Sequence, residues 1–156
     1  MVPSLAYTDP LAAIEWLSRA FGFEIAMLLT DDSGALAHAE MTFRGAHIGI
    51  MGEWESVDLL GRAKIRSPKS TGAVTQFLWV NVDDAVTHCA RARAAGASIV
   101  QDPADQPYGA RTYRALDPEG HVWNFREPIK DVSDRDFEKS TGLTYVKAVD
   151  QVRRRR

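Results

Sequence analysis

The sequence predicts an α+β fold in which a β-α-β-β-β module occurs twice. A helical stretch over Asp9–Gly22 is followed by a second one of equal length over Asp83–Gly96. Each begins with an aspartate that can cap a helix and ends with a glycine that can close one. The turn glycines Gly45 and Gly120 are separated by nearly the same offset as the two stretches. Self-similar spacing of this kind indicates a repeated structural unit.

The first module is expected to occupy residues 1–52. A β-prone run over 2–8 precedes Asp9, and Pro10 then stands at the first helical position, where its missing N–H costs nothing. Apolar residues recur at helical spacing as far as Phe21. Strands are expected over 23–30, 36–43 and 47–51, because turn-forming residues separate these runs.

The second module is expected over residues 73–128, after a linker over 53–72 that shows mixed charge and no period. It should contain a strand over 74–82, the helix capped by Asp83, and a closing hairpin over 108–125. The hairpin turn, Asp117–Gly120, has Pro and Gly where turn geometry favours them. Residues 129–156 should form an extension with a short helix and an Arg-rich tail.

The last strand of that hairpin has two unlike faces. Trp123 and Phe125 alternate with Val122, Asn124 and Arg126. We expect the aromatic face to pack against the second helix and the other face to border a cavity.

Composition excludes several functional classes. The net charge is −2, so no general attraction to nucleic acid is expected. No apolar run approaches the roughly 20 residues of a membrane span. The one cysteine, Cys89, cannot form an internal disulfide, which suits the reducing cytoplasm. We therefore expect a cytoplasmic protein with no nucleic-acid or membrane partner.

The two modules, with the motifs AAIEWLSRAFGFE, ARARAAGA and YGARTYRALDPEGHVWNF, resemble the vicinal oxygen chelate superfamily. This superfamily includes glyoxalase I, extradiol dioxygenases and bleomycin resistance proteins. The resemblance covers residues 1–128 and implies one domain of this fold. It implies that each module curls its sheet into half a barrel, with helices on the convex side and the ligand cavity on the concave side. It also implies a homodimer, because cavities in this fold are often completed across two chains.

The resemblance places the four metal positions of the superfamily's metalloenzymes at Val2, Gly49, Phe77 and Asn124. The first three residues have no side-chain ligand atom, and asparagine offers one neutral oxygen. We therefore expect no metal and no other cofactor at this site.

Strand alternation and the resemblance together predict which residues line the cavity instead. Phe77 and Trp79 could stack on a flat or cationic ligand. Trp54 could act as a lid or lie at a dimer contact. Arg111 could pair with a ligand anion or with a loop carbonyl. The expected ligand-binding residues are Ser4, His47, Met51, Trp54, Phe77, Trp79, Asn81, Arg111 and Asn124.

His38, Glu40 and His47 form a second group of candidates. If the strands over 36–43 and 46–52 pair, all three share one sheet face. They could bind a metal at a non-family position, act as an acid/base pair, or form a hydrogen-bonded polar patch. They are the candidate catalytic residues.

Three functions fit these observations. The favoured one is metal-free binding of a small aromatic or amphipathic molecule, such as a drug or toxin that is sequestered. The second is an enzyme, namely a glyoxalase-like lyase, isomerase or dioxygenase, with a displaced metal or with metal-free acid/base chemistry. The third is a dimeric interaction module. The identity of the ligand is left open by the sequence.

Overall fold

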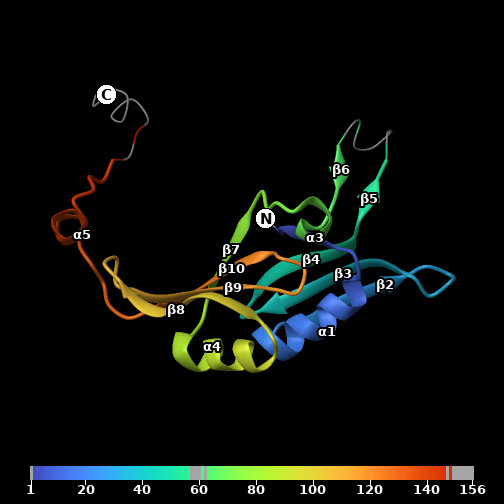
Figure 1. Cartoon of the computed structure of the whole chain (residues 1–156), viewed down its shortest axis with the longest axis horizontal. Helices are drawn as coiled ribbons and strands as arrows, with labels where there is room; N and C mark the ends of the chain where they lie inside the picture. Colours follow the sequence, from blue (N-terminus) through green and yellow to red (C-terminus); the bar gives the residue numbers. More distant parts are fainter. Residues whose placement is uncertain (1, 57–60, 62, 147, 149–156) are drawn as a thin grey trace.

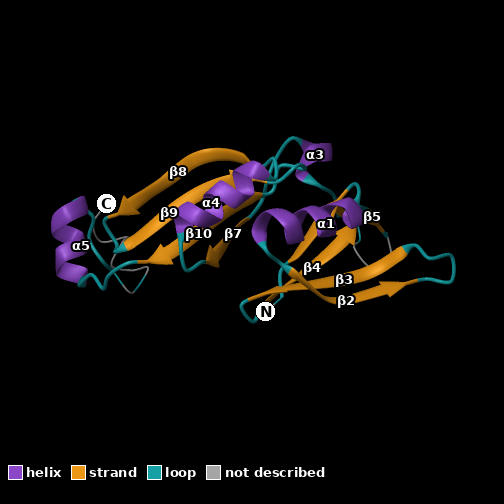
Figure 2. Cartoon of the chain, turned by 90° about the horizontal axis from the view of Figure 1, so that it is seen from below, coloured by secondary structure: helices purple, strands orange, loops and turns teal. Residues whose placement is uncertain are grey.

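Two four-stranded sheets, each carrying one helix on one face, make up most of the chain (Figures 1 and 2). The structure is a computed structural model that describes residues 2–56, 61, 63–146 and 148. The predicted Arg-rich tail over 153–156 lies outside the described residues. The strand orders are β1-β4-β3-β2 and β7-β10-β9-β8, so both sheets have the same topology. The predicted α+β fold with two β-α-β-β-β modules is therefore confirmed.

The first module contains β1 (Ser4–Tyr7), α1 (Pro10–Phe21), β2 (Glu24–Thr30), β3 (Leu36–Phe43) and β4 (Ala46–Gly52). The second contains β7 (Phe77–Asn81), α4 (Ala85–Ala94), β8 (Ser98–Gln106), β9 (Ala110–Leu116) and β10 (Val122–Pro128). In each sheet the first and last strands of the module pair in parallel, and the remaining pairs are antiparallel.

The helix caps show one error in the sequence prediction. Asp9 caps α1 as expected, since its side chain accepts a hydrogen bond from the N–H of Ala12. The cap of α4 is Asp84 and not Asp83, because Asp84 Oδ1 accepts from the N–H groups of Val86 and Thr87. Asp83 instead forms an ion pair with Arg44 at 2.7 Å. The two caps are thus separated by the same offset as the turn glycines of the two modules.

The linker between the modules has more structure than the sequence predicts. The two-residue strands β5 (Trp54–Glu55) and β6 (Lys64–Ile65) pair, and the short helix α3 (Pro68–Thr71) follows them. Figure 1 shows this hairpin extending from the sheets on the side opposite α1 and α4. After β10, helix α5 (Asp134–Thr141) lies at the far end of the second module.

The core lies between the helices and the sheets, and it is continuous between the modules. Phe21 at the end of α1 packs against Trp123 and Phe125 of β10, with ring centroids 5.3 and 4.7 Å apart. Trp16 donates its indole N–H to the carbonyl of Ala95 at 2.9 Å. The aromatic face of the closing hairpin is therefore buried, as predicted, and it contacts α1 as well as α4.

The turn over Asp117–Gly120 links the two modules by hydrogen bonds. Asp117 Oδ2 accepts from the Tyr7 hydroxyl at 2.7 Å and from the Trp123 indole at 3.1 Å. Glu119 accepts from the backbone N–H groups of Thr8 and Asp9 and from the Thr8 hydroxyl. Both carboxylates are buried, so these donors replace the water that the charges have lost.

Ser67 of the linker also donates its hydroxyl to Glu119, at 2.5 Å. Burial opposes ionisation of Glu119, but the hydrogen bonds from Ser67, Thr8 and Asp9 outweigh it and lower the pKa of this carboxyl. Glu119 therefore joins three separate segments of the chain.

We expect Glu119→Gln to lower the free energy of unfolding by about 1–3 kcal/mol, because an amide has one acceptor oxygen where the carboxylate has two. Urea unfolding measures the change. The matched control is Glu15→Gln on the exposed face of α1, which should change stability by less than about 0.5 kcal/mol. Equal losses for both variants would contradict the role of Glu119 as a cross-link.

His88 on α4 predicts a pH dependence of stability. Its Nε2 donates to the Phe21 carbonyl at 2.9 Å, so Nδ1 is left to accept from the Tyr113 hydroxyl at 2.5 Å. Burial lowers the pKa of His88 below the ordinary value of 6.5, although the bond to Phe21 opposes the shift. At pH values between the lowered pKa of the folded protein and 6.5, His88 is protonated in the unfolded chain but not in the folded one.

The contribution of His88 to stability is therefore complete above about pH 6.5 and is lost as the pH falls below it. We expect the free energy of unfolding to decrease from pH 7.5 to pH 5.5 more steeply in the unmodified protein than in His88→Gln. Urea unfolding at the two pH values measures both slopes. Parallel pH profiles would show that His88 does not contribute.

Candidate functional site

Each sheet has one face without a helix, which we call its open face. In the second module the face toward the helices carries the fully buried side chains of Tyr113, Trp123 and Phe125. The residues that alternate with them along β9 and β10 therefore lie on the open face. Phe77 and Trp79 of β7 lie there with 54% and 55% of their surface exposed. Their ring centroids are 6.3 Å apart. Large aromatic groups are thus presented to solvent on a regular sheet.

The strand register places four open-face residues side by side in a row across the second sheet. Asn124 is paired with Trp79 on one side and with Arg114 on the other, and Arg114 is paired with Gln101. Directly opposed residues have Cβ atoms about 4.5–5.5 Å apart. The row therefore places an indole, an amide, a guanidinium and a second amide on four successive strands.

Asn124 and Arg114 contact each other directly. Arg114 donates its Nε–H to Asn124 Oδ1 at 2.7 Å. Asn124 is 3% exposed, and among the described residues its Nδ2 has no hydrogen-bond partner. Arg114 is exposed and has no acidic partner within the part of the chain that the structure describes.

Sequence reasoning did not select Arg114 as a site residue, because the facing of the strand before the turn was left undetermined. The signal was nonetheless present in the hairpin. The tight turn over Asp117–Gly120 pairs Leu116 with Val122, which places Arg114 opposite Asn124.

The open face of the first module has a different polar group. Glu40 of β3 lies between His38, with Nε2–Oε1 at 3.5 Å, and His47, with Nδ1–Oε2 at 3.6 Å. All three side chains are partly exposed. The structure thus brings the candidate catalytic residues together on one face.

The repeat gives these two polar groups equivalent positions. In the first sheet Glu40 of β3 is paired with Gly49 of β4. In the second sheet Arg114 of β9 is paired with Asn124 of β10. Since β3 and β4 occupy the places in the first sheet that β9 and β10 occupy in the second, the two pairs correspond. The same place in the fold therefore carries the negatively charged Glu40 in one module and the positively charged Arg114 in the other.

The residues present do not fit the divalent metal that the fold family implies. At the four positions, Val2, Gly49 and Phe77 offer no ligand atom. Asn124 Oδ1, its one potential ligand atom, accepts a hydrogen bond from the Arg114 cation. A Cβ on Gly49 would lie 2.5 Å from Ser4 Oγ, so a ligating side chain there would require the Ser4 hydroxyl to move. No group of three or more metal-ligating side chains with suitable geometry occurs among the described residues.

Three of the predicted binding residues line one groove between the modules. This groove, with a volume of about 990 Å³, is bordered by His47, Trp79 and Asn81. Ser4 borders a second cavity of about 450 Å³, next to residues 64–76. Met51 is half-buried near the end of β4.

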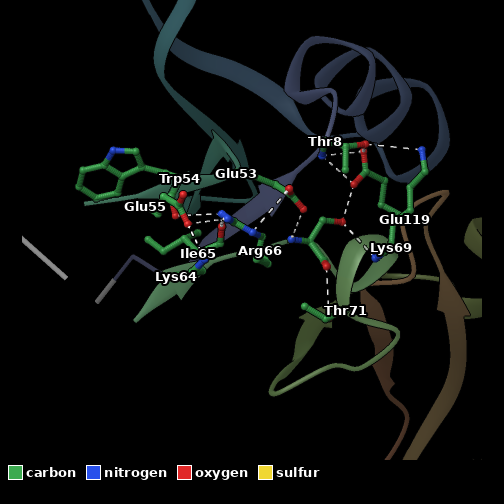
Figure 3. Close-up of polar contacts among 11 residues, drawn as sticks. Thr8, Glu53, Trp54, Glu55, Lys64, Ile65, Arg66, Lys69, Thr71 and Glu119 are labelled. Carbon is green, nitrogen blue, oxygen red and sulfur yellow. Dashed lines mark hydrogen bonds and ion pairs between the residues drawn. The ribbon is translucent and has the colours of Figure 1, made fainter. Parts of the chain in front are cut away.

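Arg111 and Trp54 lie away from that groove. Arg111 Nε pairs with Asp105 on the neighbouring strand at 2.7 Å, so its charge already has a partner. Trp54 lies on the β5–β6 hairpin and points away from the polar contacts at the base of the hairpin (Figure 3). There Glu53 accepts from the N–H of Ser67, and Arg66 pairs with Glu55 at 2.9 Å.

Comparisons with known proteins agree with this architecture. The model of the glyoxalase/bleomycin resistance protein/dioxygenase superfamily matches residues 3–125. The crystal structure of TioX from Micromonospora sp. ML1 is 33% identical with a TM-score of 0.62, and the match covers 83% of this chain and 98% of TioX. TnmS3, an antibiotic binding protein from Streptomyces sp. CB03234, is 20% identical with a TM-score of 0.60, and the match covers 81% and 93% of the two chains.

A curated relative extends the comparison. An uncharacterized protein of Mycobacterium bovis is 28% identical over 131 residues, which is 84% of each chain. Within the described part of the chain, no helix has both the length and the apolar character needed to cross a membrane.

Proposed function

Because the chain belongs to the glyoxalase/bleomycin resistance protein/dioxygenase superfamily, we propose that it binds a small aromatic or amphipathic molecule without a metal. The observation that carries this proposal is the exposure of Phe77 and Trp79 on the open face of the second module. Contiguous exposed apolar patches on soluble proteins often mark ligand-binding grooves or interaction sites. Flat rings stack on such side chains and gain both buried area and favourable ring contacts.

Two further points support binding over metal chemistry. The four family metal positions lack a ligand set. Three of them have no side-chain ligand atom, and the fourth, Asn124, uses its Oδ1 to accept a hydrogen bond from Arg114. One structural relative, TnmS3, is an antibiotic binding protein. We therefore infer that the ligand is a drug-like or toxic compound and that binding sequesters it in the cytoplasm, where the buried Cys89 stays a free thiol.

A homodimer is part of this proposal. In a single chain both open faces are exposed, including Leu29 of β2 at 49% in addition to Phe77 and Trp79. A second copy would cover these faces and enclose a ligand, with residues 1–128 as the domain and 129–156 as an extension. Sedimentation analysis should give twice the chain mass of 17.3 kDa. A monomer that binds ligand with full affinity would refute this arrangement.

Thermal unfolding against a panel of aromatic antibiotics and metabolites tests the binding function. We expect at least one compound to raise the midpoint in the presence of EDTA, since a ligand that binds only the native state stabilises it. Trp79→Ala and Phe77→Ala should each reduce affinity for that compound by roughly tenfold, which corresponds to about 1.4 kcal/mol per lost aromatic contact.

The matched control is Tyr145→Ala, which removes an equally exposed aromatic side chain from the C-terminal extension and should leave affinity unchanged. A panel with no stabilising compound would count against the binding function, and equal effects of all three variants would remove the open face as its site.

The second candidate is an enzyme, and one observation favours it. The Glu40 carboxylate lies within 3.6 Å of both His38 and His47, an arrangement that can exchange protons with a bound substrate. Mass spectrometry of the stabilising compounds after incubation separates the two functions. Unchanged compounds support binding, whereas conversion that Glu40→Gln abolishes would establish catalysis.

A further inference from the structure

We propose that Arg114 and Asn124 form a binding site for the carboxylate of an aromatic acid. The inference rests on the proposed binding function and specifies the class of ligand. It follows from the guanidinium of Arg114, the unpartnered amide of Asn124, the charge of the surrounding face and the position of Trp79.

Arg114 is oriented but not neutralised. Its Nε–H is used by Asn124 Oδ1, which fixes the plane of the guanidinium. The two Nη groups have no hydrogen-bond partner among the described residues, and they form an edge whose geometry matches the two oxygens of a carboxylate. Exposure of Arg114 leaves this edge accessible.

Asn124 supplies the second donor. The bond from Arg114 fixes the oxygen of the amide, so Nδ2 must point elsewhere. Within the described structure, Nδ2 is buried and has no acceptor. A buried donor without an acceptor is unfavourable, and a carboxylate oxygen bound beside Arg114 would accept the hydrogen bond from Nδ2.

The surrounding face is positively charged. Arg126 follows Asn124 on the same face of β10, is half-buried, and also forms no ion pair with a described residue. No acidic side chain occurs in the three central rows of this face. The rows are Phe77, Val122, Leu116 and Ser98; Trp79, Asn124, Arg114 and Gln101; and Asn81, Arg126, Thr112 and Ala104. Two unpaired cations without an acid favour an anionic ligand.

Trp79 completes the site. It is paired with Asn124 on the side away from Arg114, so two strand spacings, about 10 Å, separate the indole from the guanidinium. A bicyclic aromatic acid has about this length. Its rings can stack on Trp79 while its carboxylate reaches Arg114 and Asn124.

Three probes that share one ring system test the proposal, namely 2-naphthoate, 2-naphthamide and 2-naphthylmethylamine. Their affinities for the full chain are measured by ¹H–¹⁵N NMR titration at low salt. We expect the carboxylate to bind roughly tenfold more tightly than the amide, and the amine to bind most weakly. Arg114→Gln should abolish this preference, whereas Arg111→Gln, a matched loss of an arginine already paired with Asp105, should retain it.

Asn124→Asp provides a second variant that does not depend on the folding of Arg114→Gln. The new carboxylate should pair with Arg114 and remove the preference for 2-naphthoate. Equal affinity for all three probes in the unmodified protein would overturn the carboxylate site and leave the binding function intact. Retention of the preference in both Arg114→Gln and Asn124→Asp would also overturn the site. No binding of any probe would overturn it too, whereas the binding function is decided separately by the compound panel.

Discussion

The buried carboxylates of Asp117 and Glu119 are the contacts on which the arrangement of the two modules depends. A buried charge is costly unless donors surround it, so each carboxylate fixes the groups that it accepts from. Asp117 accepts from the backbone N–H groups of Glu119 and His121 and from the side chains of Tyr7 and Trp123. Glu119 accepts from the start of α1 and from the linker. The turn thereby joins the first strand, the last hairpin and the linker by hydrogen bonds.

Within this symmetric frame the open faces differ at equivalent positions. The first module has Glu40 between two histidines, where the second has Arg114 bonded to Asn124. A repeated fold therefore presents a glutamate–histidine group on one face and arginine with aromatic side chains on the other. A metal site needs converging ligands from both modules, and neither Gly49 nor Asn124 provides one. Stacking on Trp79 and charge pairing with Arg114 offer the second module a way to bind a ligand without a metal.

Much of the fold could be predicted from the sequence, because it depends on local signals. The caps of α1, the turn over Asp117–Gly120 and the alternation along β10 are each specified by neighbouring residues. The cap of α4 was misplaced by one position, since Asp83 and Asp84 are both good cap residues and stand next to each other in the sequence. The β5–β6 hairpin was missed because such short strands carry no periodic signal. Arg114 was missed for a different reason: its facing depends on register, which becomes visible only when the hairpin is extended from its turn.

The tryptophan side chains provide the most direct test of the open face as the binding site. Of the four, Trp16 and Trp123 donate their indole N–H groups to protein acceptors in the core, and Trp54 lies on the linker hairpin. Trp79 is the one on the open face of the second module. The ¹⁵N-indole signals are therefore recorded during titration with a stabilising aromatic ligand in EDTA. We expect the Trp79 signal to shift most while those of Trp16 and Trp123 stay in place. An unchanged Trp79 signal at saturation, or loss of binding when EDTA is added, would contradict metal-free binding at this face.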